Sequence, residues 1–294
     1  MKIILVVTDS KRKNLVFVSD KLDILSLDEA VKLAKEGKIE GTHTVRRSSG
    51  VFLRTNKNIP RSQELETMAL SFSQLSSFHD DINGLVSTPF SNYLKLYENA
   101  LRARGGDFII IDARPLATKE DIKNKLQPHK NIIFEAADHF HIDSYLLGAI
   151  LIDEIARTAP LENIFNNVTV NFLGRNTSLG IAQMKTDTAY DLVKSNLYNP
   201  NPNDEFLKHK LNPAVRSRLY EYLIQPKHSI FFAAAGIRSL INNWKRFINL
   251  ENRPEILATL YSRKYKDPHV KPESNERGLQ IANEFYSLAE QWLK

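Results

Sequence analysis

The 294-residue chain contains no cysteine. This absence excludes disulfide bonds, cysteine-containing metal sites and thiol nucleophiles. The eight histidines are scattered, and the only close pair, His139 and His141, comes without an indicated third ligand. The sequence therefore predicts neither a metal ion nor any other cofactor.

Long hydrophobic runs are also lacking. The longest apolar stretches, such as Ile3–Val7 and Phe108–Ile111, have the length of a strand, and a bilayer requires roughly 18 consecutive apolar residues. The first residues lack the apolar region and the small-residue cleavage site of a secretory signal peptide. We therefore expect no membrane span. We also expect a protein made in the cytoplasm that stays there or is exported or injected by a signal-independent route.

Basic residues are in excess but do not form one long block. The formal net charge of +6 suits three kinds of anionic partner, namely nucleic acid, a membrane surface or a cell-wall polymer. No nucleic-acid-binding motif is present. Solvation of the surface is the simplest explanation, and we expect no nucleic-acid partner.

Residues 1–60 predict a small α+β module. Strands are expected over Lys2–Thr8 and Leu15–Ser19, joined by a polar turn. Ser26 and Glu29 form a capping-box pattern at the start of a helix that Gly37 ends. Two short strands follow, over Thr42–Arg46 and Val51–Arg54.

The strings LSLDEAVKLAKEGKIEGTHTV and GVFLRTNKN within this module resemble a small bacterial domain of unknown function. That domain attaches to varied partners, so the resemblance implies a targeting, docking or folding role and no chemistry.

Residues 61–125 predict a connector. Apolar spacing favours a helix over Gln63–Phe78 and another over Leu94–Arg104. The segment DFIIIDAR, bounded by Gly106 and Pro115, favours one buried strand.

Residues 126–294 are nearly all helical in pattern. An irregular loop is expected over 158–177 and a second one over 199–204. The expected helices are 128–140, 143–157, 187–195, 205–223, 229–248, 254–263 and 275–292.

Glu154 lies within an apolar pattern. On a helix that begins at the N-cap residue Asp143, Glu154 falls near the centre of an apolar stripe, and Asp153 falls about 90° away. A buried carboxyl group is costly unless it is paired, protonated or used. Glu154 is therefore either a core residue held by an arginine or by backbone donors, or a functional acid. The stripe consists of Leu146, Leu147, Ile150 and Leu151.

The string AADHFHIDSYLLGAILIDE (136–154) resembles the entry to the active site of lytic transglycosylases and goose-type lysozymes. In that family the last Glu is the catalytic acid. The matching positions are Ala137, Asp143, Leu146, Leu147, Ala149, Ile150, Leu151 and Glu154.

Two further segments resemble the same family. Ser178–Met184 is similar to its S-x-G-L/I-x-Q block, and the residues from Thr186 to Ala189 are similar to the P-x-T-A start of a helix. Ile256–Tyr261 is similar to A-x-A-Y-N, whose tyrosine lies beside the catalytic Glu. The similarity spans about residues 128–290.

The resemblance implies a mainly helical, lysozyme-like domain over 126–294. It also implies cleavage of the β-1,4 bond between N-acetylmuramic acid and N-acetylglucosamine in peptidoglycan. Glu154 would hand its proton to the leaving oxygen, and an apolar stripe would help it to keep that proton. Tyr261 would orient Glu154 or stabilise positive charge on the sugar. The sugar-binding residues would be Ser178, Gly180 and Gln183, with Tyr261.

A second catalytic carboxylate is not evident. Goose-type enzymes place an Asp two residues after the Gln of the second block, where this chain has Lys185, and the nearest acid is Asp187. For Asp153, solvation or a salt bridge is expected. A single-acid mechanism, in which Glu154 then accepts the proton of the substrate's own 6-hydroxyl, fits better than inverting hydrolysis with its two separated carboxyl groups.

The chain departs from the family at three places. Ile155 replaces a serine, Ser262 replaces an asparagine, and the loop between Glu154 and Gln183 is longer. Three hypotheses follow. The chain is a peptidoglycan-cleaving effector, with glycan strands and a secretion apparatus or an immunity protein as partners. Alternatively, it is a catalytically inactive lysozyme-like binding or structural protein, or a helical interaction module whose motif matches are accidental.

Overall fold

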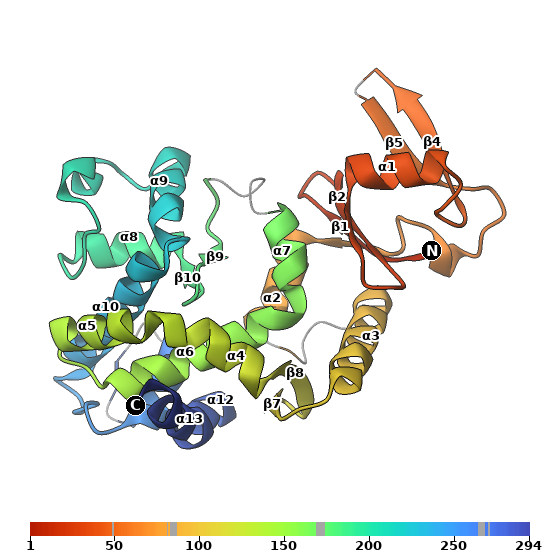
Figure 1. Cartoon of the computed structure of the whole chain (residues 1–294). Coiled ribbons are helices and arrows are strands. Elements are labelled where there is room, and N and C mark those ends of the chain that lie inside the picture. The colour runs from red at the N-terminus through yellow and green to blue at the C-terminus, as the bar shows by residue number, and fades with distance from the viewer. Residues whose placement is uncertain (49, 81, 83–86, 169–173, 264–267, 270) are drawn as a thin grey trace. The chain divides into compact units, whose positions relative to one another are not determined.

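The computed structural model describes every residue except 49, 81, 83–86, 169–173, 264–267 and 270 (Figure 1). Helices and strands are both present, which confirms the predicted α+β class. The chain forms two compact units. Unit 1 contains residues 1–118 and 158–171, and unit 2 contains residues 119–157 and 172–294. This division differs from the predicted one, because residues 61–118 and 158–171 join the N-terminal module.

Unit 1 is built on a mixed sheet with the strand order β3-β2-β1-β6. β1 (Ile3–Thr8) pairs antiparallel with β2 (Asn14–Ser19), as predicted, and β2 pairs with β3 (Ile24–Ser26). β6 (Ala69–Ser71) lies parallel to β1. Five of the six residues of β1 are buried, so the strand forms part of the core on both of its faces.

The capping box at Ser26 is confirmed. The backbone N–H of Glu29 donates to the Ser26 hydroxyl, and the backbone N–H of Ser26 donates to the Glu29 carboxylate, at the start of α1 (Leu27–Lys35). α1 contacts β4 (Thr42–Arg47) and β5 (Gly50–Thr55), the two predicted strands, which pair with each other as an antiparallel hairpin.

The predicted helix over Gln63–Phe78 is wrong for most of its length. This segment contains the 3₁₀ helix η1 (Arg61–Gln63), then β6, and only then α2 (Phe72–Asp80). Ser71 starts α2 because its hydroxyl accepts from the backbone N–H of Gln74 and the Gln74 side chain accepts from the backbone of Ser71.

The predicted single strand between Gly106 and Pro115 is a hairpin. Asp112 and Ala113 both have positive φ, which is the conformation of a tight two-residue turn between strands. The predicted irregular loop after residue 158 contains helical segments in its described part. The hairpin consists of β7 (Phe108–Ile111) and β8 (Arg114–Thr118), and it follows the helix α3 (Thr88–Arg104). The helical segments after residue 158 are η3 (Ala159–Leu161) and α7 (Glu162–Val168).

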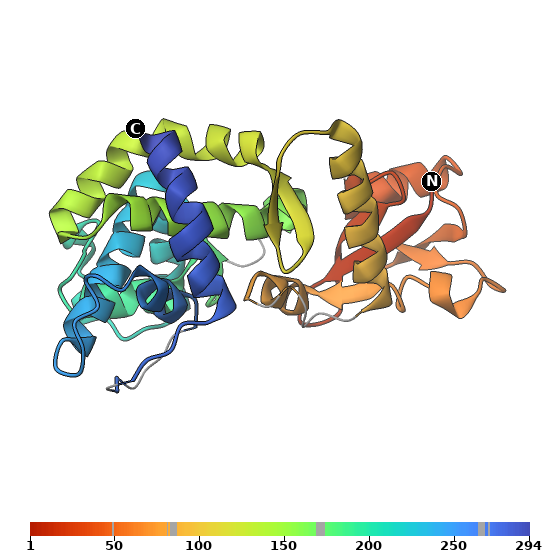
Figure 2. The same ribbon diagram turned by 90° about the horizontal axis from the view of Figure 1, so that it is seen from below.

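Unit 2 is mainly helical (Figures 1 and 2), and its described residues include a short antiparallel hairpin. No helix among the described residues is long and apolar enough to cross a bilayer. The elements are α4 (Lys119–Leu126), η2 (Gln127–His129), α5 (Lys130–Phe140), α6 (Ser144–Thr158), β9 (Ser178–Leu179), β10 (Met184–Lys185), α8 (Thr186–Lys194), η5 (Pro202–Asp204), η6 (Phe206–Lys208), α9 (Pro213–Leu223), α10 (Pro226–Trp244), α11 (Pro254–Arg263), α12 (Glu276–Gln280), the π-helix η7 (Ile281–Phe285) and α13 (Tyr286–Leu293).

α10 is the centre of unit 2 and contacts α5, α8, α9 and α11. The helix predicted over 205–223 begins only at Pro213, because Asn212 caps it by accepting from the backbone N–H of Val215. The residues before it form two 3₁₀ turns, with Glu205 at positive φ between them. α4 was not predicted from the sequence, and the helix predicted over 275–292 contains a π-helical turn.

Candidate active site

α6 carries the two acidic residues of the site. Its start is the predicted one, because the Asp143 carboxylate accepts from the backbone N–H groups of Tyr145 and Leu146. Every residue from Leu146 to Arg157 is buried, so α6 is covered on all sides and the predicted single apolar stripe is wrong. Asp153 and Glu154 are both in the core as a result, with exposed fractions of 1% and 4%.

Both carboxylates belong to one buried ion cluster. Asp153 accepts from Arg157 Nε at 2.9 Å and from Arg277 Nε at 2.7 Å. Glu154 Oε1 accepts from Arg277 Nη2 at 3.0 Å. Burial alone would raise the pKa of Asp153, but the charges of Arg277 and Arg157 outweigh it and hold that pKa below its usual value. Of the two roles expected for Asp153, the salt bridge is the one observed.

A close contact between two helices sets the position of Arg277. Asn275 caps α12 by accepting from the backbone N–H of Gly278 at 2.7 Å, and it also accepts from the Thr259 hydroxyl of α11 at 3.1 Å. A Cβ atom at Gly278 would lie 2.0 Å from Thr259 Oγ1 and 2.4 Å from the carbonyl oxygen of Glu255. Glycine is therefore required at this position for α12 to approach α11 this closely.

The Ser178–Met184 block forms the β9–β10 hairpin. Gly180 has φ +69°, and a Cβ there would lie 2.0 Å from the carbonyl oxygen of Leu223 and 2.5 Å from Ser229 Oγ. The Ser229 hydroxyl of α10 also accepts from the backbone N–H of Ala182 at 3.2 Å. Gly180 thus lets the turn approach α9 and α10 closely.

Tyr261 lies between this turn and the ion cluster. Its hydroxyl donates to the carbonyl oxygen of Ala182, with 3.3 Å between the oxygens. Burial raises the pKa of Tyr261, and the negative charge of Glu154 raises it further, while Arg277 opposes both effects. The structure therefore brings together Glu154, the turn of the second block and Tyr261, which sequence reasoning had named separately.

Two of the predicted sugar-binding residues have structural contacts within the hairpin. Gln183 has φ +46°, and its side-chain amide donates to the carbonyl oxygen of Gly180 at 2.9 Å. Ser178 lies opposite Lys185, at the end of the hairpin away from the turn. Gln183 stabilises the turn in this arrangement, because its amide is directed at the turn's own backbone.

Asp187, the nearest sequence candidate for a second carboxylate, is engaged by an arginine. Arg216 Nε and Nη2 donate to its two carboxylate oxygens at 2.7 and 3.1 Å. A bidentate pair of this kind fixes both side chains. Through this pair Asp187 links α8 to α9. Asp153, in contrast, shares Arg277 with Glu154.

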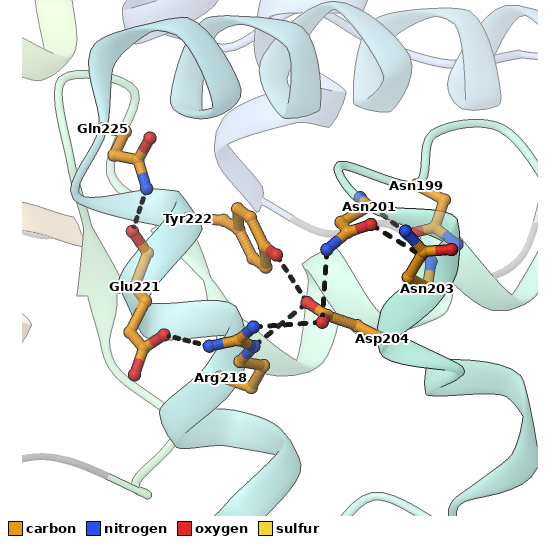
Figure 3. Close-up of polar contacts among 8 residues, drawn as sticks. All are labelled: Asn199, Asn201, Asn203, Asp204, Arg218, Glu221, Tyr222 and Gln225. Carbon is orange, nitrogen blue, oxygen red and sulfur yellow. Dashed lines mark hydrogen bonds and ion pairs between the residues drawn. The ribbon is translucent and has the colours of Figure 1, made fainter.

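A second polar cluster holds the 199–204 loop against α9 (Figure 3). The Asp204 carboxylate accepts from Arg218 Nε at 3.0 Å, from the Tyr222 hydroxyl and from the Asn201 side-chain amide. Hydrogen bonding from Arg218 lowers the pKa of Asp204. Arg218 also donates to Glu221 at 2.7 Å, so the cluster is a fixed support for the loop.

Sequence reasoning missed the two arginines of the ion cluster. Arg157 follows Asp153 by four positions on one helix, a spacing that indicates a pair. Arg277 has only a weak local signal, its place after the N-cap residue Asn275. Among the described residues, no group of three His, Asp or Glu side chains could hold a metal ion.

The comparisons with known proteins give no match. No family model, no curated protein and no solved structure matches the chain. The chemistry of the site rests on its own geometry and on the motif resemblance.

Proposed function

We propose that unit 2 is a lysozyme-like domain that cleaves the glycan strands of peptidoglycan, with Glu154 as its single acid and base. The observation that carries the proposal is the convergence of Glu154, the β9–β10 turn and Tyr261. Tyr261 links the other two through its bond to Ala182 and its electrostatic interaction with Glu154. If the three motif matches were accidental, there would be no reason to expect these three parts of the chain to lie together.

The proposed step needs one carboxyl group. Protonated Glu154 gives its proton to the glycosidic oxygen while the bond from that oxygen to the anomeric carbon breaks. The Glu154 carboxylate then takes the proton of the substrate's 6-hydroxyl, whose oxygen bonds to the anomeric carbon and closes a 1,6-anhydro ring. Neither water nor a second carboxylate takes part, in agreement with the engagement of Asp187 by Arg216.

Arg277 constrains this mechanism. Arg277 Nη2 donates to Glu154 Oε1 at 3.0 Å, and this bond holds in place the carboxyl group that has to reach the glycosidic oxygen. Glycan binding therefore has to weaken the bond between Arg277 and Glu154 before proton transfer. Asp153 can hold Arg277 during this change, because it already accepts from Arg277 Nε.

The same ion cluster favours a second candidate, an inactive lysozyme-like protein that holds glycan or another partner. Two buried carboxylates and two arginines neutralise one another, which is the arrangement expected of a structural core. In that case Glu154 stabilises the fold and transfers no proton.

Turbidity loss of purified cell walls separates the two candidates. Wild-type protein should clear the suspension, and Glu154→Gln should not, because the amide keeps the shape but cannot donate a proton. Glu135→Gln is the matched control, since Glu135 is exposed and its pair with Lys227 is long, at 3.9 Å. The control should clear the suspension like the wild type. If the wild-type protein does not clear the suspension, the inactive lysozyme-like protein is the candidate that remains.

A further inference from the structure

The β4–β5 hairpin of unit 1 carries a concentration of positive charge. Between Gly41 and Gln63 the chain has five cationic side chains and no acidic one. The preceding acid, Glu40, lies 3.8 Å from the N-terminal ammonium group and 3.9 Å from Lys2. The hairpin itself therefore supplies no counter-charge. The hairpin contains the cations Arg46, Arg47 and Arg54, and Lys57 and Arg61 follow directly after it.

The hairpin has an inner and an outer face. Leu53 is buried in the N-terminal core with Ala30 of α1, and α1 contacts both strands. Because successive side chains of a strand point to opposite faces, Phe52 and Arg54 point away from this core. The strands extend beyond α1 (Figure 1).

The strand register fixes which residues share the outer face. The cross-strand pairs are Val45 with Phe52, His43 with Arg54, and Arg47 with Gly50. The outer face thus presents a cation at Arg54, an aromatic ring at Phe52 and a cation at Arg47, in steps of about 7 Å. Arg47 and Arg54 are exposed and Phe52 is half-buried.

We propose that this outer face binds single-stranded nucleic acid. Proteins that bind single strands combine cations for the phosphates with aromatic rings on which bases stack. Arg47 and Arg54 would take two phosphates, and Phe52 would stack on the base between them. A duplex keeps its base faces covered, and an anionic wall polymer or lipid surface offers no base to Phe52.

The linear sequence argued against a nucleic-acid partner because its basic residues form no block. Antiparallel pairing changes this, since it brings Arg47 and Arg54 to one face on either side of Phe52. This proposal concerns unit 1 alone and does not depend on glycan cleavage.

Fluorescence anisotropy of a labelled oligothymidylate with the full-length protein tests the proposal. Binding should weaken with salt, and the double variant Arg47→Ala/Arg54→Ala should reduce the salt slope by about 1.4, the value for two lost phosphate contacts. Phe52→Leu keeps apolar bulk but removes the ring, and it should weaken binding about tenfold with an unchanged salt slope. Circular dichroism and thermal unfolding check that each variant is folded.

The matched control is Lys21→Ala/Lys35→Ala, which removes the same charge from exposed positions outside the hairpin. The affinity of this control for the oligothymidylate should be within about twofold of the wild-type affinity, because both lysines lie outside the face that would bind the nucleic acid. A duplex of the same length and inorganic polyphosphate should compete weakly. Three results would overturn the proposal: no binding, equal loss in the lysine control, or unchanged binding by Phe52→Leu with full competition by polyphosphate.

Discussion

Arg277 Nη2 donates to Glu154 Oε1 at 3.0 Å, although 123 positions separate the two residues in the chain. The same guanidinium donates to Asp153, the neighbour of Glu154. The candidate acid is therefore one member of a buried ion cluster, and its charge is coupled to the position of α12. Whether this carboxylate transfers protons depends on how firmly Arg277 is held.

Arg277→Gln should destabilise the protein strongly. Removing one cation from a buried pair leaves carboxylates without compensation, and the expected loss in the free energy of unfolding is about 3–5 kcal/mol. Urea denaturation at neutral pH measures it. Arg253→Ala is the control, because Arg253 pairs with Glu255 at 2.6 Å but is 45% exposed, and its loss should be below about 1 kcal/mol. Equal losses in both variants would contradict the account of the cluster.

Asp153 should make stability fall at acidic pH. Its pKa is lower in the folded protein than in the unfolded chain, because Arg277 and Arg157 outweigh the effect of burial. The stabilisation is therefore present above the unfolded pKa of about 3.9 and is lost as the pH falls through the folded value. Urea unfolding between neutral and acidic pH should show a smaller decrease for Asp153→Asn than for the wild type. Parallel curves would show that Asp153 is not the titrating group.

Gly278→Ala should separate α12 from α11. The added Cβ would lie 2.4 Å from the backbone carbonyl oxygen of Glu255, a contact that no rotamer change relieves, so we expect a loss of about 1–3 kcal/mol. Thermal unfolding measures the loss. In Gly236→Ala the new Cβ would lie 3.6 Å from Met184 and 3.7 Å from Tyr261, which is ordinary contact. That variant should be as stable as the wild type, and a larger loss there would contradict the packing described.

Tyr261→Phe should lower glycan cleavage more than it lowers stability. The lost hydroxyl makes a bond of 3.3 Å to Ala182, so the expected loss of stability is about 1 kcal/mol or less. If the hydroxyl helps to organise the site around Glu154, the initial rate of cell-wall clearance should fall by about tenfold or more. Tyr190→Phe removes a similar hydroxyl bond, to the His209 carbonyl, and should keep full activity. A rate equal to that of the wild type would remove Tyr261 from the mechanism.

Local signals in the sequence predicted local structure well. The caps at Ser26 and Asp143 were found because each depends only on residues within three positions. The same reasoning failed between Gln63 and Phe78. Leu65 and Met68 there have helical spacing, but they are buried in the N-terminal core, while Ala69–Ser71 pairs with β1.

The site was predictable only in part. Glu154 and Tyr261 were named because their motifs are contiguous in sequence, and the structure brings them together. Arg277 was missed because its contact with α6 depends on the packing of α12 on α11. The apolar stripe was misleading for a similar reason, since the burial of α6 on all sides depends on helices that follow it in the chain, such as α13, whose Leu293 would meet a Cβ at Gly148.

Mass spectrometry of purified peptidoglycan after digestion tests the central claim most directly. With Glu154 as the lone acid and base, the wild-type protein should release fragments that end in 1,6-anhydro-N-acetylmuramic acid, and Glu154→Gln should release none. Reducing ends in place of anhydro ends would show that water is the nucleophile and would contradict the single-carboxyl mechanism. Absence of any fragment from the folded wild-type protein would contradict glycan cleavage itself.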